Sequence, residues 1–116
     1  MDLIVRHLES AGVPVVSVTG EVDLATVPRL RDALAVAAID HPGQRVAVDL
    51  DGVTMLDSAG LGVPVGALRR MTASGGDLVV VCSTRRLLDL LAQCRLDRVF
   101  EIRASLADVT GGMRRG

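Results

Sequence analysis

One serine in the chain combines a chemically useful hydroxyl with a setting that favours contact with other molecules. Ser58 follows Asp57 where a β-branched strand leads through a short loop into a glycine-spaced helix start. A hydroxyl at the first residue of a helix can accept bonds from free backbone N–H groups, worth on the order of 1 kcal/mol. Small neighbours also leave it within reach of another protein. The spacing predicts either a hydroxyl that caps the helix or a hydroxyl that another protein contacts.

The helix expected after Ser58 contains residues that weaken helices. Gly60, Gly62 and Gly66 each cost roughly 1 kcal/mol relative to alanine, and Pro64 costs more beyond the first turn. Helix stability alone would not select this composition. Glycine permits close approach of another group, either from the sheet beneath the helix or from a partner above it. The sequence leaves both interpretations open.

Two aspartates support a competing, enzymatic interpretation. Asp49 and Asp51 lie in an Asp-Leu-Asp-Gly-Val-Thr run that resembles the nucleophile motif of haloacid-dehalogenase-type phosphatases. That resemblance implies attack on phosphate by Asp49, acid–base work by Asp51 and a bridging magnesium ion. These enzymes normally need a later lysine, whereas all 13 basic residues here are arginine. We therefore expect no enzyme, and a simple turn is the alternative role for the Asp51-Gly52 pair.

Other catalytic patterns are not matched either. A nucleophile elbow requires glycine two residues before its serine, and Leu56 stands there before Ser58. His7 and His41 are expected in a strand and a turn, with no acid–base partner placed by spacing, so we expect surface histidines. The cysteine and histidine spacings suggest no metal site. We expect neither a metal nor a cofactor.

Composition limits the class of partner. A chain of 116 residues with 49% hydrophobic residues fits one compact domain, and a single aromatic residue argues against base stacking on nucleic acid. A net charge of -1 gives little attraction to nucleic acid or anionic lipid, and no apolar stretch approaches membrane-spanning length. Cys82 and Cys94 lie in apolar contexts, which predicts two buried free thiols and a cytoplasmic location. The expected partner is a protein.

The hydrophobic pattern predicts an α/β fold. The expected strands cover 3–9, 13–19, 45–50, 77–82 and 98–103. The first expected helix has Thr26 as its N-cap and ends at 41. The other expected helices cover 58–74, 85–94 with a Ser83-Thr84 cap, and at most 105–110. This order implies a mixed sheet of four to five strands, an antiparallel hairpin followed by parallel βα units, covered by about four helices. We expect one domain over 1–110 and a flexible tail over 111–116.

Two boxes of residues carry a specific resemblance. The first is Gly20-Glu21-Val22-Asp23, with Thr26 to Arg31 behind it, and the second runs from Asp57 to Gly62 after Val48-Asp49-Leu50. Together they make the chain resemble the STAS domain family, and more narrowly the single-domain anti-sigma factor antagonists of bacteria. The resemblance extends from about Leu3 to Val109 and implies the STAS fold. It also implies that the chain binds a kinase-type anti-sigma factor and thereby releases a sigma factor.

The resemblance assigns roles to the residues of both boxes. The serine that follows the aspartate in the second box is the residue phosphorylated by the cognate kinase, which is Ser58 here. Asp23 lies beside this phosphoacceptor by resemblance, although it can equally bond loop amides. Asp57 either caps the helix or orients the serine. The expected partner-binding residues are Asp23, Thr26, Asp57, Ser58, Ala59, Gly60, Leu61 and Gly62.

The resemblance also implies the partners of the switch. They are an anti-sigma factor serine kinase of the GHKL type and a PP2C-type phosphatase, with no direct nucleic acid, no membrane insertion and a monomer or weak dimer. The alternative is a STAS domain of another assembly, a stress-signalling complex or a lipid-transporter subunit, in which Ser58 only caps. Two residues depart from the family pattern: Ala59 replaces a common second hydroxyl, and Pro64 opposes a regular helix.

Overall fold

The computed structural model describes residues 3–112, except for the side chains of residues 58, 59 and 110–112. Its strands are β1 (Ile4–Ser10), β2 (Val13–Val22), β3 (Arg45–Leu56), β4 (Asp77–Val81) and β5 (Glu101–Arg103). Its helices are α1 (Val27–Asp40), α2 (Ser58–Ala73), α3 (Arg85–Gln93) and α4 (Leu106–Gly112), with a short 3-10 helix over Leu96–Arg98. Among the described residues, no helix is both long and apolar enough to cross a membrane.

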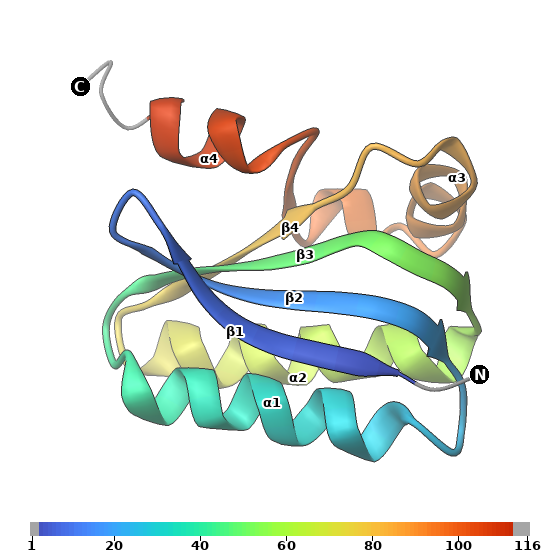
Figure 1. Cartoon of the computed structure of the whole chain (residues 1–116), viewed down its shortest axis with the longest axis horizontal. Helices are drawn as coiled ribbons and strands as arrows, with labels where there is room; N and C mark the ends of the chain where they lie inside the picture. The colour runs from blue at the N-terminus through green and yellow to red at the C-terminus, as the bar shows by residue number, and fades with distance from the viewer. Residues whose placement is uncertain (1–2, 113–116) are drawn as a thin grey trace.

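The strands form one mixed sheet in the order β1-β2-β3-β4-β5. β1 and β2 are antiparallel, and the other neighbouring pairs are parallel. In Figure 1, α1 and α2 lie below the sheet, α4 lies above it, and α3 lies beyond the end of β4. The predicted fold class, with its hairpin, parallel βα units and four helices, is confirmed.

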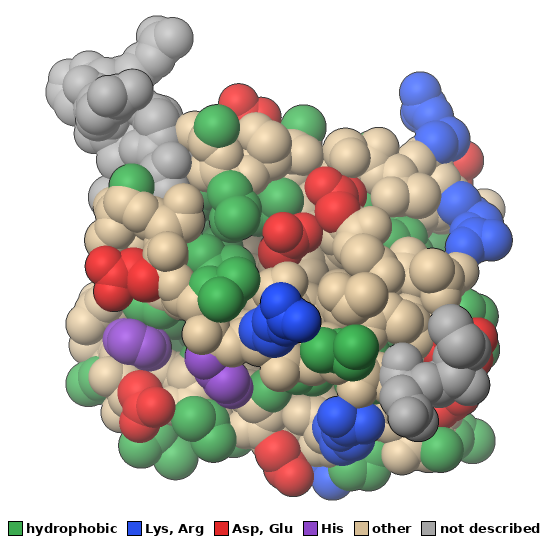
Figure 2. Space-filling model, in the orientation of Figure 1, with side chains coloured by type: hydrophobic (Ala, Val, Ile, Leu, Met, Phe, Trp, Pro, Cys, Tyr) green, Lys and Arg blue, Asp and Glu red, His purple; other side chains and the backbone are tan. Residues whose placement is uncertain are grey.

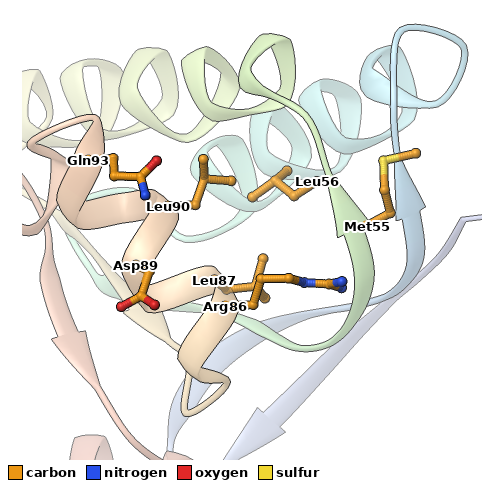
Figure 3. A pocket seen from close by; sticks show the side chains of 7 residues that line it. All are labelled: Met55, Leu56, Arg86, Leu87, Asp89, Leu90 and Gln93. Atoms are coloured by element: carbon orange, nitrogen blue, oxygen red, sulfur yellow. The ribbon is translucent and has the colours of Figure 1, made fainter.

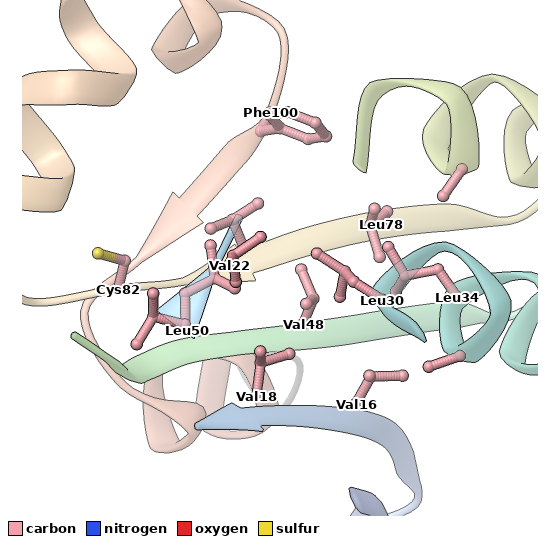
Figure 4. Packing of buried hydrophobic residues seen from close by; sticks show 14 of the residues in the cluster. Val16, Val18, Val22, Leu30, Leu34, Val48, Leu50, Leu78, Cys82 and Phe100 are labelled. Carbon is pink, nitrogen blue, oxygen red and sulfur yellow. The ribbon is translucent and has the colours of Figure 1, made fainter. Parts of the chain in front are cut away.

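Alternation along the strands builds a core on each face of the sheet. Val46 and Val48 of β3 belong to the larger cluster, which includes Leu30 and Leu34 of α1, whereas Ala47 belongs to a smaller one beneath α4. Figure 4 shows the larger cluster, with side chains of the sheet meeting those of α1. Burial on both faces accounts for the continuous apolar run of this strand.

β3 is longer than expected because it contains two irregularities. Ser17 pairs with Asp49 but Thr19 pairs with Gly52, so β3 holds an extra residue there, and a second extra residue follows after Val53. Such bulges let a strand continue past residues that break a regular pattern. A Cβ on Gly52 would lie 2.8 Å from Thr19 Oγ1, so the backbones approach closely at this point. The expected turn at Asp51-Gly52 was therefore wrong.

The ends of the chain's elements differ modestly from expectation. β5 covers only Glu101–Arg103, because the residues before it form the 3-10 helix. α2 runs as one helix through Pro64. α4 continues to Gly112, and residues 113–116 of the expected tail lie outside the described residues. Cys82 is buried as expected, but Cys94 is exposed because it follows α3 at the surface, so the prediction of two buried thiols was wrong for Cys94.

The surface has mixed charge on the face that carries β1. Figure 2 shows acidic, basic and apolar side chains interspersed there, without a continuous field of one sign. This distribution agrees with the net charge of -1 and gives that face no strong attraction for a polyanion.

Candidate functional site

The two sequence boxes meet at one edge of the sheet. β2 ends at Val22 and β3 ends at Leu56, and these two residues are paired across the parallel ladder. The Asp57 N–H donates to the Val22 carbonyl oxygen at 3.2 Å, which holds the two following loops together. Carboxyl ends of neighbouring parallel strands are where open α/β sheets place their binding sites. Asp23 and Asp57 therefore begin adjacent loops, although 34 positions separate them in the sequence.

The loop after β2 is closed by its own hydrogen bonds. Asp23 Oδ1 accepts from the Ala25 and Thr26 N–H groups at 2.9 and 3.0 Å. Thr26 Oγ1 donates to the Glu21 carbonyl oxygen at 2.8 Å and accepts from the Asp23 N–H at 3.0 Å. Asp23 thus bonds loop amides, which is the simpler of its two predicted roles. The loop presents Leu24, whose surface is 77% exposed.

Thr26 is the N-cap residue of α1 by position, but not by hydrogen bonding. Its hydroxyl makes no capping bond to the helix, because that hydroxyl is committed to the loop. Thr84 before α3 likewise makes no side-chain cap bond. The expectation that these hydroxyls cap their helices was wrong, and for Thr26 the reason is that a loop contact competes for the same hydroxyl.

The first turn of α2 contains glycines of two kinds. A Cβ on Gly60 would lie 2.6 Å from Val22 Cγ1 and 2.9 Å from Leu56 Cδ1, so this glycine lets the helix pack closely on the sheet. A Cβ on Gly62 would meet nothing within 4 Å, and Gly62 is exposed. Close packing on the sheet therefore explains the glycine at position 60. It does not explain the glycine at position 62, for which close approach by a partner stays the other interpretation.

The remaining predicted site residues divide between surface and core. α2 begins at Ser58, as the sequence predicted, and the side chains of Ser58 and Ala59 lie outside the described part of the chain. Asp57 is half-buried beside them. Leu61 is only 5% exposed and belongs to the core, so its predicted place on the partner surface was wrong: its side chain points beneath the helix, where it supports the site.

The two aspartates of the enzymatic alternative serve the strand ends. Asp49 Oδ1 accepts from the Asp51 N–H at 3.0 Å, within the bulge of β3. Asp51 Oδ1 accepts from the N–H and the hydroxyl of Ser83, at 2.6 and 3.1 Å. Burial raises the pKa of the nearby Cys82 thiol, and the charges of Asp51 and Asp49 act in the same direction. Asp51 thus ties β3 to the segment before α3, and Asp49 holds the bulge of β3.

A pocket beside the two boxes was not predicted. It lies between the end of β3 and α3, and it is lined by Met55, Leu56, Arg86, Leu87, Asp89, Leu90 and Gln93. Figure 3 shows Leu56 and Leu90 close together, with Arg86 extending from α3 toward β3. The sequence carries one signal for it, the broad apolar stripe of Leu87, Leu88, Leu90 and Leu91 on α3.

Comparison with known proteins agrees with the fold and the two boxes. The STAS domain model matches residues 5–109. An anti-sigma-B factor antagonist of Listeria monocytogenes is 33% identical over 94 residues, covering 81% of this chain and 82% of that protein. An anti-sigma-F factor antagonist of Mycobacterium tuberculosis is 34% identical over 107 residues, covering 90% of this chain and 84% of that protein.

Solved structures agree as well. The crystal structure of an anti-sigma factor antagonist from Mycobacterium paratuberculosis superposes with a TM-score of 0.80 at 27% identity, covering 97% of this chain and 95% of that one. These named proteins are regulators that act by binding, not enzymes. With the family model spanning the sheet and both boxes, the chain belongs to the STAS domain family.

Proposed function

We propose that the chain is an anti-sigma factor antagonist: it binds a kinase-type anti-sigma factor in the cytoplasm, releases a sigma factor, and is switched off by phosphorylation of Ser58. The observation that carries this proposal is the junction of the Asp23 loop with the first turn of α2, fixed by the bond from Asp57 N–H to Val22. The anti-sigma factor antagonists among its relatives support the same role.

The switch follows from local electrostatics. The Ser58 hydroxyl takes the γ-phosphoryl group of the kinase's ATP, and ADP and a proton leave. The phosphate adds about -1.5 to -2 charges, which the N-terminus of α2 favours by about 0.3 to 1 kcal/mol. Asp57 and Asp23, which begin the two adjoining loops, oppose it. The fold therefore changes little.

The partner interface responds more strongly than the fold does. A protein surface packed over Ser58 would have to enclose a new charge, and an unpaired buried charge costs about 2 to 5 kcal/mol. That is a loss of affinity between about thirtyfold and several thousandfold. A PP2C-type phosphatase that removes the group restores binding. Partner choice is thus reset without refolding.

The test combines labelling with binding. The protein is mixed with candidate GHKL-type anti-sigma factors and with ATP, and the phosphate is mapped by mass spectrometry. Ser58→Ala should abolish labelling yet keep binding, whereas Ser58→Glu should bind at least about thirtyfold more weakly. Ser74→Glu, at an exposed serine just beyond the other end of α2, is the matched control and should bind like wild type.

Two outcomes would contradict the proposal. Labelling that persists in Ser58→Ala would place the phosphoacceptor elsewhere. A Ser58→Glu variant that binds as tightly as wild type would refute the charge switch while leaving the binding of the anti-sigma factor in place.

A further inference from the structure

β1 forms an open edge of the sheet. It is the first strand in the sheet order and, in the described part of the chain, it pairs with β2 alone. In Figure 1 this edge faces the viewer, between α1 below and α4 above. Four consecutive residues, Arg6 to Glu9, are exposed. Because alternate side chains of a strand point to opposite faces, both faces of the sheet are open to solvent along this part of β1.

β1 lacks most of the features that keep edge strands from pairing with other strands. Such features are bulges, prolines, lysines and a covering helix or loop. The seven residues of β1 pair with β2 in an unbroken register, and they include neither proline nor lysine. Leu8 adds an apolar side chain that is 52% exposed. The polar side chains that β1 does carry therefore decide which strand this edge can accept.

The order of these side chains is complementary to itself. When two copies of β1 pair antiparallel about a two-fold axis at Leu8, His7 of each copy lies opposite Glu9 of the other. On the other face of the sheet Leu8 meets Leu8, and Arg6 meets Ser10. An axis at Arg6 would place two guanidinium groups opposite each other, and an axis at His7 would place Arg6 and Glu9 opposite apolar side chains. Because opposite-charge and apolar cross-strand pairs stabilise a ladder and like charges destabilise it, the axis at Leu8 is favoured.

This axis lies far from the candidate site. Leu8 pairs with Val15 of β2, which lies seven residues before Val22. At about 3.3 Å per residue, the axis is about 23 Å along the sheet from the strand end that leads to Asp57. Pairing through β1 therefore leaves the candidate site of each copy open to another protein.

We propose that the β1 edge is a self-association surface: residues 6–10 of two copies pair antiparallel about a two-fold axis at Leu8 and join the two sheets into one. A ladder this short buries less than the roughly 1,200 Å² in total that marks a stable interface, so the dimer is weak, with a Kd of about 0.1 mM or higher. The dimer presents two candidate sites, which lie on opposite sides of the axis because the strands run antiparallel. A strand of another protein is the competing occupant, and the pairing of His7 with Glu9 favours a second copy of this chain.

Sedimentation equilibrium of the whole chain, at concentrations up to about 1 mM, tests the surface. Leu8→Glu places two carboxylates opposite each other on the axis, so it should raise the Kd of the dimer at least about tenfold. Ile4→Glu is the matched control: Ile4 is 49% exposed on the same strand and face, outside residues 6–10, and this variant should stay within about twofold of wild type. Ser58→Glu should dimerise like wild type too, because Ser58 lies outside the paired edge.

A charge exchange tests the register. His7→Glu should raise the Kd about tenfold, because it places a second carboxylate opposite Glu9. Adding Glu9→Arg to His7→Glu should restore the Kd to within about twofold of wild type, because each new carboxylate then faces a guanidinium group. With an axis at His7 the exchange could not restore pairing, since position 7 would stay opposite itself.

Circular dichroism shows whether each variant is folded, and a cysteine variant replaces Leu8→Glu if that variant unfolds. Leu8→Cys, in a Cys94→Ser background that removes the exposed native thiol, should form a covalent dimer when diamide oxidises the introduced thiols, because the axis places their Cβ atoms about 4.5 to 5.5 Å apart. Ile4→Cys in the same background should stay monomeric.

The outcomes do not depend on the proposed function, since the measurement contains no anti-sigma factor. A wild-type chain that stays monomeric up to about 1 mM would overturn the inference. So would a dimer that Leu8→Glu leaves intact, or an exchange at positions 7 and 9 that fails to restore pairing. If the wild type is monomeric and Leu8→Glu instead loses its affinity for an anti-sigma factor, the edge accepts another protein, and the inference is overturned while the proposed function stands.

Discussion

At the scale of single residues, the candidate site contains one glycine that packing within the chain requires and one that it does not require. Gly60 is required, because α2 could not approach Val22 and Leu56 with a side chain there. Gly62 has no such reason within the chain. A glycine that weakens its helix without improving any internal contact is consistent with close approach by a partner.

Gly62→Ala should therefore separate stability from binding. The substitution should raise the free energy of unfolding by up to about 1 kcal/mol, because alanine is the better helix residue and meets no neighbour. It should also weaken binding to the anti-sigma factor about tenfold or more, because the methyl group occupies space that the partner uses. Urea unfolding and calorimetric titration measure the two effects.

Gly60→Ala provides the opposite control. Its methyl group would overlap Val22 and Leu56, so it should lower stability by about 1 to 3 kcal/mol. Wild-type affinity in Gly62→Ala would show that Gly62 lies outside the interface.

At the scale of elements, the sequence predicted the strands and helices well but predicted their ends less well. The sequence predicted each α-helix of the described residues but not the 3-10 helix, and the Gly20 to Asp23 and Asp57 to Gly62 boxes fell at strand ends. The continuation of β3 beyond Leu50 to Leu56 was not predicted, because a bulge depends on pairing with β2, which no local pattern shows. The hydrogen bonds of Thr26 were not predicted for a similar reason, because its hydroxyl lies within reach of both the helix and the loop and can bond to either.

Thr26→Val tests the loop that joins β2 to α1. Valine keeps the shape of threonine but removes the bonds to the Glu21 carbonyl and the Asp23 N–H, so stability should fall by about 1 to 2 kcal/mol. Amide hydrogen exchange at residues 23–26 should accelerate as well. Thr72→Val, at an exposed position of α2, should change stability by less than about 0.5 kcal/mol. Equal stability in the two variants would contradict a structural role for the Thr26 hydroxyl.

At the scale of the whole molecule, ion pairs attach the shortest strand, β5, to its neighbours in the sheet. Arg45 of β3 contacts Asp77 of β4 and Glu101 of β5, and Arg103 contacts the same Glu101 carboxylate. These pairs link three neighbouring strands at the end of the sheet opposite the candidate site. Sequence spacing could not reveal them, because 56 positions separate Arg45 from Glu101. The pocket escaped prediction in the same way, since it forms only when α3 packs beside β3.

The Glu101 cluster predicts a pH dependence. Burial alone would raise the pKa of the Glu101 carboxyl, but hydrogen bonds from Arg103 and Arg45 outweigh it and hold that pKa below its ordinary value of 4.5. A lowered native pKa adds stability above the ordinary value and loses it as the pH falls through the native value. The stability advantage of wild type over Glu101→Gln should thus be constant near neutral pH and shrink below about pH 4.5. Denaturant titrations at several pH values measure it, and a constant advantage down to pH 3 would contradict the ion-pair account.

The most direct test of the account is the affinity of the anti-sigma factor for this chain before and after stoichiometric phosphorylation of Ser58. We predict that the Kd rises at least about thirtyfold while circular dichroism and thermal unfolding stay essentially unchanged, because a charge at the mouth of α2 blocks the partner without altering the fold. An unchanged Kd, or a lost affinity that accompanies loss of the native fold, would contradict it.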